Sequence, residues 1–84
     1  MFDVREPDEY EESHIPGAIL VPLATVPDEV ARFATAASNS TIYLVCGSGG
    51  RSGRAVSFLR DEGIDAINVD GGTKGWIAAN YPVE

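Results

Sequence analysis

Between Thr41 and Gly63 the chain passes from an apolar run through a glycine-rich turn into a segment of different periodicity. The run Ile42–Val45 holds three aliphatic residues and a tyrosine, which suits a strand covered on both faces. The turn begins with the only cysteine, Cys46, and ends with Arg51. Apolar residues then recur at helical spacing until Gly63 ends the pattern. This order predicts a buried strand, a tight loop and a helix whose N-terminus faces the loop.

The predicted loop has the features of an anion-binding site with a reactive thiol. Glycines carry no side chain and accept positive φ, so they let several backbone N–H groups turn toward one point. Ser52 is expected to cap the helix, and the pKa of Cys46 should fall beside a helix N-terminus and Arg51. A lone cysteine is more often buried and inert, but the flanking glycines and Arg51 favour a nucleophile here. The predicted loop residues after Cys46 are Gly47, Ser48, Gly49, Gly50, Arg51 and Ser52.

Composition and charge narrow the range of functions. A chain of 84 residues, 44% apolar and 23% charged, predicts one globular domain over residues 1–84 with a modest core. The net charge of −7 argues against a nucleic-acid or anionic-membrane partner, so an anion site has to be made locally. A single cysteine excludes an internal disulfide and a zinc site built from several cysteines. Neither a signal peptide nor a membrane-length apolar run is present, and a cytoplasmic protein is expected.

Strand and helix patterns alternate along the rest of the chain. Further strands are predicted at Phe2–Val4, Ala18–Val21 and Asp65–Val69, and further helices at Asp8–Glu12, Val26–Ser38 and Lys74–Asn80, the last capped by Thr73. Strands that alternate with helices at this spacing imply a parallel sheet. Ligands of such sheets bind at the carboxyl ends of the strands, which is where Cys46 stands.

Three segments in this order resemble the signature blocks of the rhodanese (sulfurtransferase) domain: FDVREPDEYEESHIPGAI, YLVCGSGGRSGRAVSFL and VDGGTKGWIAANYPV. The resemblance covers almost the whole chain, and the C-x-S-G-x-R-S loop is a specific part of it. It implies a three-layer α/β fold, in which a short parallel sheet of four to five strands has helices on both faces. It also implies that Cys46 takes sulfur from a donor as a persulfide and passes it to a nucleophilic acceptor. In that scheme the amides of Gly47–Arg51 stabilise the thiolate and the persulfide, Arg51 orients the loop or binds an anion, and Ser52 donates to sulfur.

Two features depart from the family pattern. Family members normally carry a strand and a helix before the Asp-Val-Arg segment, so the first strand is expected to be missing or truncated here. The strand Asp65–Val69 would then be an exposed edge, either weakening the domain or pairing with another chain. Gly47 stands where members that use thiosulfate often have a basic side chain.

The expected function is sulfur transfer from a small sulfur-containing anion, such as thiosulfate, or from a protein persulfide. The acceptor would be a thiol or cyanide, and neither a metal nor an organic cofactor is implied. The main alternative is a non-catalytic rhodanese-like interaction module. A cysteine phosphatase is disfavoured, because the spacing between Cys46 and Arg51 is one residue shorter than in phosphatase loops.

Three polar residues outside the loop are expected to have structural roles. His14 could pair with Cys46, but a hydrogen-bonding role is favoured because no third orienting group is evident. Arg5 is expected to pair with Glu9 or with a neighbouring acid, and Asp3 to brace nearby loops.

Overall fold

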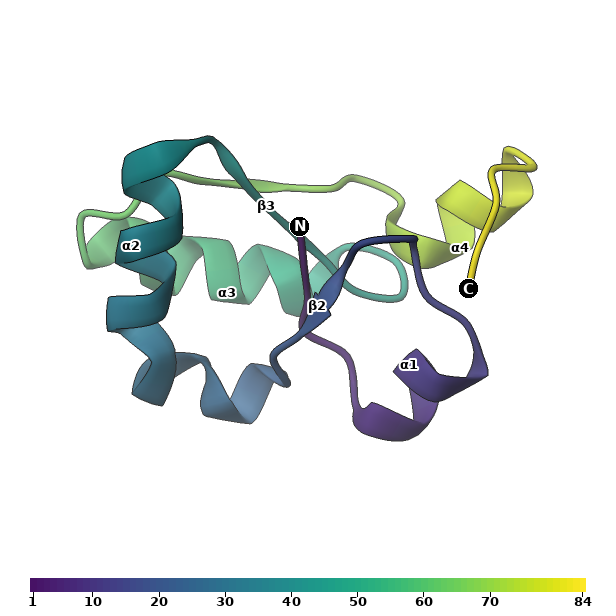
Figure 1. Ribbon diagram of the computed structural model, residues 1–84, viewed down its shortest axis with the longest axis horizontal. Coiled ribbons are helices and arrows are strands. Elements are labelled where there is room, and N and C mark those ends of the chain that lie inside the picture. The colour runs from purple at the N-terminus through teal and green to yellow at the C-terminus, as the bar shows by residue number, and fades with distance from the viewer.

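The computed structural model describes residues 1–84 as a mixed α/β fold built on one parallel sheet (Figure 1). The sheet has the strand order β2-β1-β3-β4, and its strands are β1 (Phe2–Asp3), β2 (Ile19–Leu20), β3 (Ile42–Val45) and β4 (Ala66–Asn68). The helices are α1 (Pro7–Glu12), the 3-10 helix η1 (Leu23–Glu29), α2 (Val30–Asn39), α3 (Gly50–Asp61) and α4 (Gly72–Ala78). The parallel α/β architecture predicted from the alternating pattern is confirmed.

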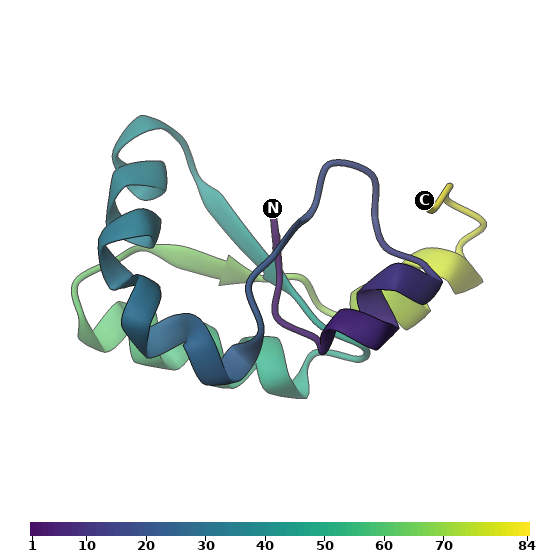
Figure 2. The same ribbon diagram turned by 60° about the horizontal axis from the view of Figure 1, so that its bottom comes forward.

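Helices cover both faces of the sheet. The register of β1 and β3 places Phe2 beside Leu44 and Asp3 beside Val45, and because side chains alternate along a strand, these two pairs point to opposite faces. The face of Phe2 and Leu44 carries the larger core, which includes Phe33 of α2 and several residues of α3. On the other face a smaller cluster around Val45 receives side chains from α1 and α4. These two helices gather at the end of the sheet where β3 ends (Figure 2).

Two predicted helix caps are wrong. Helices α3 and α4 each begin before the residue expected to cap them, so Ser52 and Thr73 lie inside the first turns. The N-cap residues are Gly49 and Gly71, with φ of 116° and 81°. Glycine adopts positive φ without a side-chain clash, so the chain enters both helices earlier than a serine or threonine cap would allow.

Other boundaries differ by a few residues. Helix α2 begins at Val30 instead of Val26, because η1 occupies the preceding residues and contains Pro27. Proline has no N–H to donate, so it does not take part in the regular hydrogen bonding of an α-helix interior. The strands β1, β2 and β4 are shorter than predicted, with two, two and three residues.

Strand β4 is an edge of the sheet, as predicted. Ile67 of β4 lies beside Tyr43 of β3 in the register, and both side chains are exposed, by 39% and 42%. One edge carbonyl is covered, because Arg60 Nε donates to Ala66 O at 3.1 Å. Pairing of this edge with another chain stays a prediction. None of the helices has the length and apolar character required to cross a bilayer.

Candidate active site

Cys46 directly follows β3 and lies against the start of α3, as the sequence predicts. The residue is buried, with 1% of its surface exposed. Gly49 N–H donates to Cys46 Sγ at 3.1 Å, and Ser52 Oγ lies 3.3 Å from the same sulfur. The positive φ of Gly49 turns the loop so that this amide faces the thiol. Strand end, glycine turn and helix start therefore converge on one sulfur atom.

The surroundings of Cys46 act on its pKa in opposite directions. Burial raises the pKa of the thiol, because a buried thiolate loses hydration. Hydrogen bonds from the Ser52 hydroxyl and from the backbone amides of Ser52, Gly49 and Ser48 favour the thiolate more strongly. The net result lowers the pKa from 9.0 to about 7. The lowered pKa increases the fraction of Cys46 that is thiolate at neutral pH.

Asn68 joins this group although it lies outside the loop residues predicted from the sequence. Ser52 Oγ lies 2.5 Å from Asn68 Oδ1, and Asn68 Nδ2 donates to Gly49 O at 3.2 Å. A ring of contacts thus runs from the Cys46 sulfur through Gly49 and Asn68 to Ser52 and back to the sulfur. Asn68 ends β4, the neighbour of β3, and parallel strands end at the same side of a sheet. A polar residue at the end of an apolar strand was therefore an available signal.

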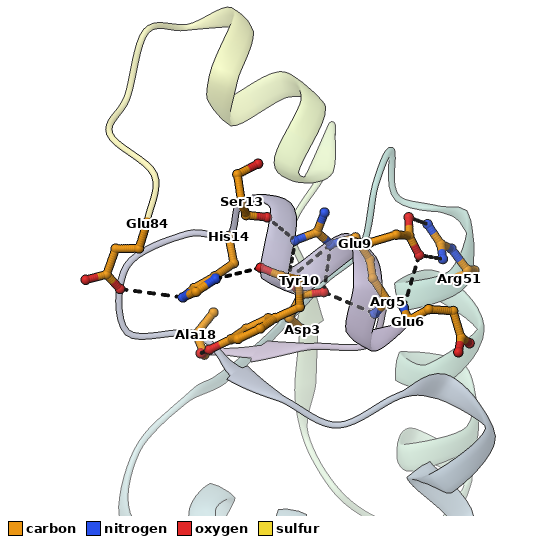
Figure 3. Close-up of polar contacts among 10 residues, drawn as sticks. All are labelled: Asp3, Arg5, Glu6, Glu9, Tyr10, Ser13, His14, Ala18, Arg51 and Glu84. Atoms are coloured by element: carbon orange, nitrogen blue, oxygen red, sulfur yellow. Dashed lines mark hydrogen bonds and ion pairs between the residues drawn. The ribbon is translucent and has the colours of Figure 1, made fainter.

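Arg51 contacts a carboxylate of α1. Its guanidinium donates from Nη1 to Glu9 Oε1 at 2.6 Å and from Nη2 to Glu9 Oε2 at 3.0 Å (Figure 3). Hydrogen bonding from Arg51, with a smaller contribution from the Glu6 amide, lowers the pKa of Glu9 from 4.5 to about 2. The same pair raises the pKa of Arg51. Arg51 therefore ties the start of α3 to α1, and its role in orienting the loop or binding an anion stays a prediction.

Arg5 has a different partner. Of the two partners expected for it, the structure shows the neighbouring acid, because Arg5 Nη2 donates to Asp3 Oδ2 at 2.8 Å and to Ser13 O at 2.7 Å. Asp3 is fully buried, and through Arg5 it holds the loop that follows α1 (Figure 3). The expected bracing role of Asp3 agrees with this geometry.

Helix α4 holds the other side of the loop. Thr73 N–H donates to Cys46 O at 2.8 Å, and Lys74 N–H donates to Gly47 O at 3.0 Å. Gly72 makes this approach possible, because a Cβ at this position would lie 2.5 Å from Cys46 O and 2.6 Å from Gly47 O. The loop backbone is therefore fixed by a helix that lies more than twenty residues further along the chain.

His14 lies among structural contacts and has none with Cys46. Its Nδ1 is 2.8 Å from Tyr10 O, its ring stacks on Tyr10 at 3.7 Å, and its Nε2 is 3.6 Å from Glu84 Oε1 (Figure 3). The favoured hydrogen-bonding role of His14 is confirmed. No group of three or more His, Cys, Asp or Glu side chains converges as a metal site requires.

Comparison with known proteins points to one family. Residues 1–79 match the rhodanese-like domain family. The chain is 36% identical over 73 residues to thiosulfate sulfurtransferase PspE of Escherichia coli (strain K12), with 87% of this chain and 69% of that protein covered. It is 39% identical over 77 residues to the putative sulfur carrier protein YrkF of Bacillus subtilis (strain 168), covering 90% of this chain. The chain spans only 40% of the length of YrkF.

A solved structure agrees with this match. The rhodanese-related protein from Thermoplasma volcanium superimposes with a TM-score of 0.89 at 31% sequence identity. The superposition covers 99% of this chain and 80% of that chain. The order of strands and helices around Cys46 is thus found in a protein of related sequence.

Proposed function

The chain belongs to the rhodanese-like sulfurtransferase family, and from this membership we propose that Cys46 transfers sulfane sulfur through a persulfide. The observation that carries the proposal is the position of the Cys46 sulfur. It receives the Gly49 N–H at 3.1 Å and lies 3.3 Å from the Ser52 hydroxyl, so negative charge on sulfur is stabilised at this point. The pKa of about 7 makes the thiolate, the nucleophilic form, abundant without a general base.

The proposed reaction has two displacement steps. In the first, the Cys46 thiolate attacks the sulfane sulfur of the donor, the donor's bond to that sulfur breaks, and its remainder leaves with the electron pair. In the second, an acceptor nucleophile attacks the outer sulfur of the persulfide, and the Cys46 thiolate leaves. The resting thiolate and the persulfide both carry their negative charge beside the amides of Ser48, Gly49 and Ser52 and the hydroxyl of Ser52. The same loop therefore serves both steps.

The proposed donors are a small sulfur-containing anion or a protein persulfide, and the proposed acceptors are a thiol or cyanide. Thiosulfate is the first donor to test, because the relative PspE is named a thiosulfate sulfurtransferase. Cys46 is only 1% exposed, so the groups that cover it have to move before the sulfur of a donor can reach the thiolate. We propose that residues 1–84 act as one domain in this chemistry.

Intact mass spectrometry tests the proposal. The protein is incubated with thiosulfate or with a cysteine desulfurase and cysteine, and the gain of one sulfur atom is measured before and after cyanide. We expect a gain on Cys46 that cyanide removes, and no gain in Cys46→Ser. Absence of sulfur on folded wild-type protein with both donors would overturn the proposal.

A non-catalytic interaction module is the second candidate. The burial of Cys46 favours it, since an inert buried cysteine would have the same low exposure. The lowered pKa of the thiol counts against it, because a structural cysteine has no need of amides directed at its sulfur. The mass experiment separates the two candidates.

A further inference from the structure

Two cationic side chains lie beside Gly47, the residue that follows Cys46. A Cβ built on Gly47 would lie 3.1 Å from Arg51 Nη2 and 4.0 Å from Lys74 Cε. Gly47 itself is buried, and these two side chains lie over it, next to the residue that carries the thiol. Lys74 is the only lysine of the chain. Sequence spacing gave no indication that it would lie here.

The two cationic side chains, Arg51 and Lys74, differ in whether they already form an ion pair. Both ends of the Arg51 guanidinium donate to the Glu9 carboxylate, at 2.6 Å and 3.0 Å, so its positive charge is largely neutralised. Arg5, another cation on this side of the sheet, is bound to Asp3 at 2.8 Å. Lys74 takes part in none of the ion pairs of the structure. Its ammonium group is therefore an uncompensated cation beside Gly47; Arg54, further along α3, is also in none of these ion pairs.

The backbone of Lys74 is fixed while its side chain is free. Its N–H donates to Gly47 O at 3.0 Å, and the residue is exposed. Because the lysine side chain is flexible, its ammonium group can stay close to a small ligand that enters or leaves the loop, while the backbone does not move. The long-range field of a chain with net charge −7 repels anions, so an anionic ligand needs a local cation to approach Cys46.

We propose that Lys74 recognises the negative charge of an anionic sulfur donor as the donor approaches Cys46. This inference rests on the proposed function and assigns a residue to donor recognition. With thiosulfate as the anionic donor, the Cys46 thiolate attacks the outer sulfur of the dianion, a new S–S bond forms, and the S–S bond of the donor breaks. Sulfite leaves with the electron pair, so the total charge stays the same and no oxidant is needed. Lys74 would offset the charge of the dianion as it approaches the thiolate.

Alkylation of Cys46 tests the role of Lys74 without any sulfur transfer. Iodoacetate and iodoacetamide react with the same thiolate, but only iodoacetate carries a negative charge. The rate constant for iodoacetate divided by that for iodoacetamide therefore measures how strongly the site attracts anions. The ratio does not depend on the pKa of the thiol, because both reagents require the same thiolate. We expect Lys74→Gln to lower this ratio about three- to tenfold at low ionic strength, the effect of one unit charge at short range. Lys74→Arg should keep the wild-type ratio. Arg32→Gln removes the same charge at an exposed position of α2 and should leave the ratio unchanged.

The same variants are then loaded with sulfur from thiosulfate and from an uncharged organic persulfide. Lys74→Gln should slow loading from thiosulfate by a similar factor and leave loading from the neutral donor unchanged. An alkylation ratio that does not depend on Lys74 would overturn the inference. Wild-type protein that takes sulfur only from the neutral donor would also overturn it, while the proposed function would stand. Wild-type protein that takes no sulfur from any donor would instead overturn the proposed function.

Discussion

Asn68 of the edge strand β4 and Ser52 of helix α3 share a contact of 2.5 Å between Oδ1 and Oγ. The Ser52 hydroxyl has one proton, and Cys46 Sγ lies only 3.3 Å from the same oxygen. Gly49 O lies 3.4 Å from this oxygen as well, so the Asn68 carbonyl, the Gly49 carbonyl and the sulfur compete for one proton. The orientation of the Asn68 amide follows from its Nδ2, which donates to Gly49 O at 3.2 Å. The ionisation of the thiol is therefore coupled to a residue on the edge of the sheet.

Replacing Ser52 by alanine should raise the pKa of Cys46 from about 7 toward its ordinary value of 9.0. The variant loses the side-chain hydrogen bond that does most to favour the thiolate, while burial still opposes it. The thiolate absorbance followed against pH gives the pKa directly, and alkylation by iodoacetamide at pH 7 should slow. Ser57→Ala, at an exposed position of the same helix, is the matched control. An unchanged pKa in Ser52→Ala would remove the assigned role of the hydroxyl.

Replacing Asn68 by aspartate should raise the pKa of Cys46, because three separate consequences of the change all disfavour the thiolate. The carboxylate holds the Ser52 proton more strongly, no longer donates to Gly49 O, and adds negative charge near the thiolate. The pH titration of the thiolate again measures the result. Asn39→Asp adds the same charge at the end of α2 and serves as the control. Equal pKa values in the two variants would contradict a role of Asn68 in tuning the thiol.

The part of the site formed by neighbouring residues could be predicted from the sequence. The apolar run before Cys46, the glycines after it and the helical spacing beyond it are local features that specify strand, loop and helix. The caps assigned to Ser52 and Thr73 failed, because the preceding glycines adopt positive φ and start the helices earlier. Contacts such as Arg51 with Glu9 join residues 42 positions apart, and local periodicity does not encode such pairs.

Glycine at position 72 should be essential for the attachment of α4 to the loop. A Cβ there would lie 2.5 Å from Cys46 O, and φ of +59° is unfavourable for residues with a side chain. We expect Gly72→Ala to lower the free energy of unfolding by about 2–4 kcal/mol, measured by urea denaturation. Gly75→Ala lies in the same helix with nothing within 4 Å of its Cβ and should stabilise the helix by up to about 1 kcal/mol. Similar effects of the two substitutions would contradict the close approach at Gly72.

The ion pair of Glu9 and Arg51 should make a small, pH-dependent contribution to stability. The pKa of Glu9 in the folded protein is about 2, below its ordinary 4.5. The stabilisation is therefore fully present above pH 4.5 and is lost as the pH falls through about 2. Both side chains are 34% exposed, so solvent screening limits the cost of Glu9→Gln to about 1 kcal/mol at pH 7.

Urea denaturation of Glu9→Gln and wild-type protein at several pH values measures this contribution. The difference between them should shrink below pH 4.5 and at high salt. Glu11→Gln, on the exposed side of the same helix, should show no such dependence. A pH-independent difference for Glu9→Gln would contradict the ion pair as its cause.

The open edge of β4 should make the protein's stability depend on its concentration. The edge strand leaves backbone groups free to pair with a second strand, and the exposed side chains of Tyr43 and Ile67 add apolar surface beside it. Arg60 covers one carbonyl of this edge through its bond to Ala66 O. We expect the melting temperature to rise with protein concentration, and Arg60→Ala to strengthen self-association in analytical ultracentrifugation.

Arg54→Ala, at an exposed position of the same helix, should behave like the wild-type protein, because Arg54 makes no hydrogen bond to the edge strand. Its comparison with Arg60→Ala separates the loss of a charge from the exposure of the Ala66 carbonyl. A cooperative, concentration-independent melt of both proteins at an ordinary temperature would show that β4 neither weakens the fold nor pairs with another chain.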